Sequence, residues 1–135
     1  MDRMLEIIEQ IDSVGGVSVV LDERDAYLAG VLQDMILTDE NVGGIIRGIY
    51  SGARGLLICT NQRILFLGRG FATMNDFKSL SYDYGDIGSI EYQKGLLFGK
   101  LIINAHGIKN EIHQILNLQA KGFIDYVRNV SPDKL

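Results

Sequence analysis

The chain has 135 residues, of which 47% are hydrophobic and 22% are charged, the balance of an ordinary soluble protein. This length predicts one domain whose core is large enough to fold without disulfides. The formal net charge of −4 argues against nucleic acid as the main partner. The single cysteine, Cys59, excludes an internal disulfide, and the acidic N-terminus does not resemble a signal peptide. No apolar run approaches the ~20 residues of a membrane span, so we expect a cytoplasmic protein.

The first 41 residues differ from the rest of the chain in charge and in pattern. They hold ten acidic and two basic residues, a formal charge of −8, whereas residues 42–135 carry +4. Apolar residues recur at the spacing of one helix face between residues 4 and 11, and a second helical pattern runs from Asp22 to Ile36. We therefore predict a helical arm over residues 1–41 that docks on a domain over residues 42–135 of opposite charge.

Short strands with polar turns between them follow the arm. The apolar pattern predicts strands near residues 44–50, 54–60, 63–69, 77–82, 88–94, 97–105 and 108–115. Asn61-Gln62 is expected to form a two-residue hairpin turn with Asn61 at positive φ. Gly107 is expected to adopt positive φ in the last hairpin.

The chain ends in an amphipathic helix, predicted over residues 117–130. Asn117 is the expected cap, and Pro132 lies just beyond the end of the helix. The order of elements predicts an α+β fold in which about seven antiparallel strands form a meander that curls into a barrel or sandwich. The last helix would then plug an open end.

Two apolar runs, LLIC and ILFL, face each other in the stretch GLLICTNQRILFLGRG, residues 55–70. Successive side chains of a strand point to opposite faces, so one interior cannot bury both runs. We assign the face that needs a cover to Leu56, Ile58, Ile64 and Phe66. The cover would be the helical arm or a second subunit. The strand around Leu96–Ile103 is also apolar on both sides, which supports the same expectation.

The same stretch resembles the signature of bacterial pleckstrin-homology-like (PH-like) domains, including the YokE-like group. That signature reads roughly G-x-L-x-x-T-x-x-R-x-x-F, and the residues that match it are Gly55, Leu57, Thr60, Arg63 and Phe66. Asp39-Glu40-Asn41 and the stretch YDYGDIGSIEYQKGLLFGKLII, residues 82–103, look like the same families. The resemblance covers about residues 39–130. It implies a PH-like barrel with a C-terminal capping helix, and a fold that serves many ligands.

Four arginines of the predicted barrel are candidate ligand-binding residues: Arg47, Arg54, Arg63 and Arg69. Eukaryotic PH domains that bind inositol phosphates cluster basic residues around the first hairpin, where this chain has only Arg47 and Arg54. Phosphate recognition usually needs several converging cations, so surface or ion-pair roles are the simpler interpretation. We expect Arg63 and Thr60 to clasp the hairpin turn through side-chain hydrogen bonds.

The sequence offers no strong pattern for catalysis, cofactors or metals. KGLLFGKL, residues 94–101, lacks the spacing and the hydroxyl residue of a phosphate loop and is interpreted as strand residues around a turn. His106 and His113 flank the last hairpin without enough nearby ligands to predict a metal site. We therefore predict neither enzymatic activity nor a cofactor.

The function predicted from these observations is that of a non-catalytic binding or assembly module. It would act through contacts with other proteins, self-association above all, because the predicted sheet has apolar side chains on both faces. The alternative is peripheral attachment to a membrane surface through anionic lipid headgroups.

Overall fold

The computed structural model describes residues 32, 34–36, 39–70 and 77–135. Its strands are β1 (Val42–Tyr50), β2 (Ala53–Thr60), β3 (Arg63–Gly70), β4 (Phe77–Asp83), β5 (Ile87–Gln93), β6 (Phe98–Ala105) and β7 (Ile108–Leu116). A long C-terminal helix and two short 3₁₀ turns complete the described part: α3 (Asn117–Val130), η2 (Tyr84–Asp86) and η3 (Pro132–Lys134). The prediction of seven antiparallel strands followed by a helix is confirmed, with strand ends that shift by one or two residues.

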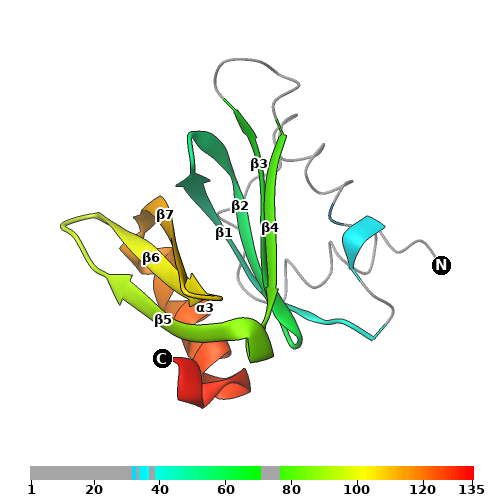
Figure 1. Cartoon of the computed structure of the whole chain (residues 1–135). Coiled ribbons are helices and arrows are strands. Elements are labelled where there is room, and N and C mark those ends of the chain that lie inside the picture. Colours follow the sequence, from blue (N-terminus) through cyan, green and yellow to red (C-terminus); the bar gives the residue numbers. More distant parts are fainter. Residues whose placement is uncertain (1–31, 33, 37–38, 71–76) are drawn as a thin grey trace.

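The strands form one antiparallel sheet in the order β4-β3-β2-β1-β7-β6-β5. β1 and β7 pair only through Ile49 with His113 and Tyr50 with Ile112, so the sheet folds into two halves that meet at a narrow junction (Figure 1). Among the described residues β4 and β5 do not pair, so the sheet stays open there rather than closing into the expected barrel. α3 packs against β1, β2 and β7 between the two halves.

Two hairpin turns place consecutive residues at positive φ, the geometry that matches the twist of the flanking strands. They are Ser51-Gly52, at 51° and 79°, and His106-Gly107, at 54° and 77°. The expectation for Gly107 is confirmed. Asn61 does not have positive φ, so that expectation is wrong. Its side-chain oxygen accepts a hydrogen bond from the backbone N–H of Asn41 at 2.8 Å, so Asn61 connects the turn to the chain before β1.

Helix α3 buries Ala120, Phe123 and Val127 at the predicted helical spacing. Pro132 begins η3 just past its end, as expected. The predicted cap is wrong, because Leu116 occupies the N-cap position and no side chain caps the helix. The Asn117 side chain is used elsewhere, in contacts described below.

The β1–β3 half of the sheet buries a different apolar cluster on each face. The inner cluster lies between the two halves and includes Ile46, Leu57, Cys59, Ile64, Phe66, Leu101, Ile112 and Phe123. The outer cluster consists of Leu32, Ile36, Val42, Ile45, Leu56, Ile58, Leu65 and Leu67, with Met35 packed against it. Apolar side chains on both faces of the hairpin therefore have separate buried environments within the chain.

The face assigned to Ile64 and Phe66 from the sequence is wrong. The register pairs Leu57 with Phe66 and Cys59 with Ile64, and residues paired directly across strands share a face, so both belong to the inner cluster. Leu56 and Ile58 do lie on the outer face, where Leu67 and Leu65 are their partners.

The outer face is covered in part by the end of the predicted arm. Leu32 and Ile36 are buried in the outer cluster, and the backbone N–H of Ile36 donates to the carbonyl of Leu32 at 3.0 Å, which is a helical contact. The other helical predictions for the arm, over residues 1–31, lie outside the described residues. No helix in the described part of the chain is both long and apolar enough to cross a bilayer.

Candidate functional site

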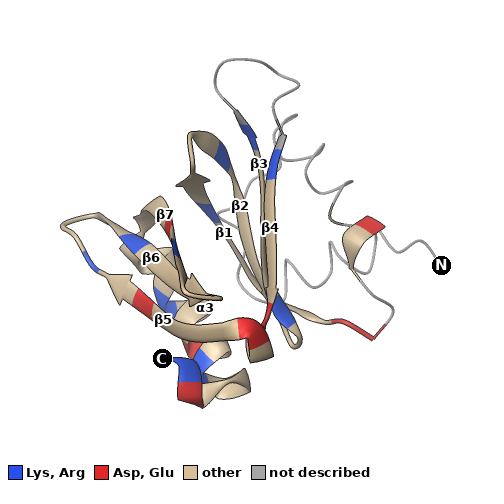
Figure 2. Ribbon diagram, in the orientation of Figure 1, with Lys and Arg blue, Asp and Glu red and all other residues tan. Residues whose placement is uncertain are grey.

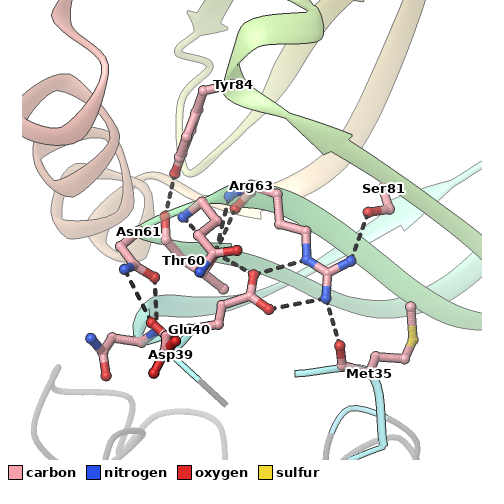
Figure 3. A network of polar contacts seen from close by, with 10 residues as sticks. Met35, Asp39, Glu40, Thr60, Asn61, Arg63, Ser81 and Tyr84 are labelled. Atoms are coloured by element: carbon pink, nitrogen blue, oxygen red, sulfur yellow. Dashed lines mark hydrogen bonds and ion pairs between the residues drawn. The ribbon is translucent and has the colours of Figure 1, made fainter. Parts of the chain in front are cut away.

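A buried carboxylate joins the chain before β1 to the β2–β3 turn. Glu40 has 0% of its surface exposed and accepts two hydrogen bonds from the Arg63 guanidinium, from Nε to Oε2 at 2.8 Å and from Nη2 to Oε1 at 3.0 Å. The Thr60 hydroxyl donates to the same Oε2 at 2.6 Å (Figure 3). A bidentate, charge-assisted pair of this kind compensates a carboxylate for its loss of water.

Thr60 also holds the turn itself, and the Arg63 side chain reaches two further segments. The backbone N–H groups of Gln62 and Arg63 each donate to the Thr60 hydroxyl oxygen at 3.0 Å. Arg63 Nη2 donates to the carbonyl of Met35 at 2.6 Å, and Nη1 donates to the Ser81 hydroxyl at 3.3 Å. The expectation for Thr60 is confirmed, whereas the Arg63 side chain connects the start of β3 to the chain before β1 and to β4. These contacts leave little of the guanidinium for a ligand.

The other three candidate arginines lie away from this clasp. The strand register pairs Arg54 with Arg69 and Arg47 with Leu56, which places all three on the outer face of the β1–β3 half. Figure 2 shows basic positions toward one end of this half and the acidic residues before β1 at the other. Arg47, Arg54 and Arg69 each have interactions within the chain. None of the three is paired with Arg63 across the strands, so the four arginines do not form one cluster.

Exposed apolar side chains gather where β5 turns into β6 and where β7 passes into α3. Leu96 is 97% exposed, Leu97 67% and Phe98 45%, while Leu118 and Leu116 are 93% and 36% exposed. The register pairs Phe98 with Leu116, and the backbone N–H of Asn117 donates to the carbonyl of Leu97 at 2.9 Å, so the two segments adjoin. We call these five residues the apolar tip.

The strand predicted over residues 97–105 is confirmed as β6, but the expectation that Leu96 and Leu97 belong to it and need a cover is wrong. Both lie in the connection between β5 and β6 and are open to solvent. The available signal was Gly95-Leu96 between the strands predicted over residues 88–94 and 97–105, with Leu97 beside them. An apolar run in a connection rather than a strand is typical of a contact surface.

The apolar tip is held on a fixed scaffold. The Asn117 side-chain nitrogen donates to the carbonyls of Gly95 at 2.9 Å and Leu96 at 3.3 Å. The Tyr92 hydroxyl donates to the Asn117 side-chain oxygen and lies 3.3 Å from the carbonyl oxygen of Ile115. Burial raises the pKa of the Tyr92 hydroxyl above its ordinary value.

A cleft of about 560 Å³ adjoins the apolar tip. It opens where β7 diverges from β1, and Gln114 bends β7 there with φ of 58°. Gly48 permits the close approach of the strands beside it, because a Cβ at this position would meet Ile112 Cγ2 at 2.6 Å. The residues that line the cleft are Arg47, Gly48, Ile49, Arg54, Phe98, Gln114, Leu116 and Gln119.

The described residues contain no group of three or more His, Cys, Asp or Glu side chains that could hold a metal ion. His106 lies in the β6–β7 turn, with its ring centroid 6.2 Å from that of Tyr82, whereas His113 pairs with Ile49 across the strands. Burial raises the pKa of the Cys59 thiol far above its ordinary value, so the side chain behaves as a small apolar group.

The open seven-stranded sheet with a C-terminal helix between its halves defines a PH-like domain, a class generally made of non-catalytic binding modules. A family model described as "Bacterial PH domain" matches residues 36–129, and the chain belongs to this family. The match begins with Ile36 of the outer cluster and includes the Glu40–Arg63 clasp.

Solved structures with low sequence identity have the same fold. A DUF1696 family protein with a pleckstrin-homology domain from Shewanella loihica is 18% identical, with a TM-score of 0.52 over 78% of this chain and 95% of that one. A pleckstrin homology domain from Shewanella amazonensis is 16% identical, with a TM-score of 0.55 over 78% and 96%. The C-terminal domain of an unknown protein from Leishmania infantum is 14% identical, with a TM-score of 0.56 over 76% and 97%. No curated protein matches this chain in sequence.

Proposed function

We propose that this domain is a non-catalytic binding and assembly module that acts through protein–protein contacts, with the apolar tip as its contact surface. The observation that carries the proposal is the exposure of five large apolar side chains on a scaffold fixed by Asn117 and Tyr92. Covering exposed apolar surface is favourable by roughly 25 cal/mol per Å². A contact surface that is already ordered loses little conformational entropy when it binds.

This proposal moves the contact surface away from the sheet face that the sequence suggested. Leu56, Ile58, Ile64 and Phe66 are all buried within the chain and offer no surface to a second protein. Leu96 and Leu118 of the tip, in contrast, have almost no cover from their own chain.

Sedimentation velocity of the full chain at micromolar concentrations tests the proposal. We expect the native chain to associate, and the double variant Leu96→Ser, Leu97→Ser to sediment as a monomer with an unchanged circular dichroism spectrum. Ile108→Ser is the matched control, because Ile108 is also an exposed apolar residue, 60% exposed, but lies at the β6–β7 turn. If the native chain stays monomeric at every concentration, self-association is excluded as the form of the contact.

A membrane surface is the second candidate partner, because Lys94 and Lys100 flank the exposed Leu96 and Leu97. Basic residues beside an apolar projection suit a surface of anionic lipids. Lys100 is already paired with Glu111 at 2.6 Å, which weakens this candidate. Co-sedimentation with vesicles that contain phosphatidylserine tests it. Binding that falls as salt rises and is lost in the Leu96→Ser, Leu97→Ser variant would favour lipid over protein.

A further inference from the structure

We infer that the outer face of the β1–β3 half is a docking surface for an acidic amphipathic helix, and that its occupant is the segment 22–31 of this chain. The contact has an apolar part on the outer cluster and a charged part on Arg47, Arg54 and Arg69. The inference is independent of the proposed function, because it concerns neither the apolar tip nor its partner. It adds the face, the direction and the paired residues to the expectation of a docked arm.

Three arginines stand together at one end of this face. Arg54 pairs directly with Arg69 across β2 and β3, and Arg47 pairs with Leu56, two residues along β2 from Arg54. Like charges directly opposite each other destabilise a sheet, and a group of opposite charge offsets this effect. None of the described residues that pair with the three across the strands is acidic, yet each arginine has an interaction within the chain. These observations favour an anionic partner that belongs to the chain itself.

The chain already reaches the outer face near the opposite end of β3. Leu32 and Ile36 are buried in the outer cluster, with Met35 packed against it. The carbonyl of Met35 accepts a hydrogen bond from Arg63 Nη2 at 2.6 Å, which fixes this point of the chain at the start of β3. The backbone hydrogen bond from Ile36 to Leu32 is helical. The residues before Leu32 therefore continue from a point that lies on this face.

The length of the preceding segment matches the length of the face. A helix rises about 1.5 Å per residue, so the 13 steps from Met35 back to Asp22 span about 20 Å. A strand rises about 3.3 Å per residue, so the six steps from Arg63 to Arg69 also span about 20 Å. A helix that follows β3 from the Arg63 end would therefore bring its first turn to the three arginines.

The sequence at the start of that helical pattern is acidic. Asp22, Glu23 and Asp25 fall in its first turn, with a single arginine among them. Acidic side chains at this position are also favoured by the helix dipole. Leu28 precedes Leu32 by four residues, so the apolar stripe continues toward the acidic end at the spacing of one helix face. Three carboxylates are thus matched to three arginines, and Leu28 is matched to the outer cluster.

A nitroxide spin label in the full chain tests the direction of docking by NMR. The label is attached to Arg24→Cys, which removes none of the three acids. Cys59 is buried and its raised pKa keeps it unreactive, so the introduced cysteine takes the label. We expect paramagnetic broadening to remove the amide signals of Arg54 and Arg69 and to leave more of the Arg63 signal.

The matched control is the same label at Asp34→Cys, an exposed position next to Met35. From there the label should weaken the signal of Arg63 more than that of Arg69. If the label at position 24 affects Arg63 more than Arg69, or affects neither, the inference is overturned.

Charge reversal tests the pairing in the chain labelled at position 24. The double variant Arg54→Glu, Arg69→Glu should recover the signals at both positions, with an unchanged circular dichroism spectrum. Adding Asp22→Lys, Glu23→Lys and Asp25→Lys should remove the signals again, because opposite charges then meet once more. Signals that stay lost after the first reversal, or stay visible after the second, would overturn the charged part of the contact.

A mixed sample shows whether the segment docks on its own chain. Spin-labelled chains without isotope enrichment are mixed with unlabelled, isotope-enriched chains, so that only contacts between chains broaden the signals. We expect the signals of Arg54 and Arg69 to persist in this sample. Their loss would place the segment on a second copy and overturn docking within one chain.

Discussion

Glu40 shows how one residue can link distant segments of the chain. Its carboxylate is fully buried, and three hydrogen bonds from Thr60 and Arg63 replace the water that it has lost. Arg63 extends the link to Met35, before β1, and to Ser81 on β4. The Glu40 carboxylate and its partner Arg63 therefore connect the segment before β1, the β2–β3 turn and β4 through hydrogen bonds.

We expect Glu40→Gln to lower the free energy of unfolding by about 3–5 kcal/mol, because it leaves the Arg63 charge partly buried without its partner. Urea unfolding followed by circular dichroism measures this loss. Glu91→Gln is the matched control, because Glu91 is exposed on β5, and we expect a change within about 0.5 kcal/mol. Equal losses for the two variants would show that the clasp is not a stabilising element.

Two surface ion pairs allow a test by pH. The hydrogen bond from Lys100 lowers the pKa of Glu111, and the hydrogen bond from Lys121 lowers that of Asp125. When folding lowers the pKa of a carboxyl group, the group stabilises the folded state at pH values above its pKa in the unfolded chain. This stabilisation is lost as the pH falls through the pKa of the group in the folded chain. In an NMR titration we expect Lys100→Gln to raise the pKa of Glu111 and to leave that of Asp125 unchanged. Lys121→Gln should do the reverse, and a shift of both carboxyls in either variant would contradict the pairing.

At the level of elements, α3 packs against β1 and β7, the two strands through which the halves of the sheet meet. It lies so close to β1 that a Cβ at Gly43 would meet the ring of Tyr126 at 2.2 Å. The glycines at the start of β1 thus serve packing against the helix. At the other end of α3, Asn117 does not cap the helix but fixes the β5–β6 connection, so the helix also orders the apolar tip.

We expect Asn117→Ala to release the connection between β5 and β6, because the carbonyls of Gly95 and Leu96 lose their donor. Hydrogen exchange measured by NMR should show faster exchange of the amides from Gly95 to Phe98, with a loss of about 1 kcal/mol in stability. Asn129→Ala, at an exposed site on the same helix, is the control. Unchanged exchange in the connection would mean that Asn117 is not what holds the tip.

For the molecule as a whole, the β1–β3 half is a layer with an apolar cluster on each side. The inner cluster is completed by β5–β7 and α3, whereas the outer cluster is completed by Leu32, Met35 and Ile36 from the segment before β1. That segment also supplies the carbonyl of Met35 to the clasp. The end of the predicted arm therefore packs on the outer face of the sheet and contacts Arg63.

Substitution of Leu32 by a smaller residue tests whether the outer cluster needs the segment before β1 for its stability. We expect Leu32→Ala to cost about 2–5 kcal/mol, the range for a buried leucine in a packed core, and to increase the binding of a hydrophobic dye. Asp34→Ala, exposed and close by in sequence, is the control and should have little effect. If the two variants unfold at the same urea concentration, the outer cluster does not depend on this segment.

The sequence by itself determined the strands, the last helix and the PH-like class, because period-2 and helical spacings and turn residues are local properties of the chain. It also identified Thr60 as the side chain that holds the β2–β3 turn. It misplaced Ile64 and Phe66, because the face that a strand buries depends on its register with its neighbour. It missed Glu40 as the centre of the clasp, because 20 and 23 residues separate Glu40 from its two partners. Only the tertiary structure decided that Leu96 and Leu97 are exposed, because exposure depends on what packs over a residue and not on its hydropathy.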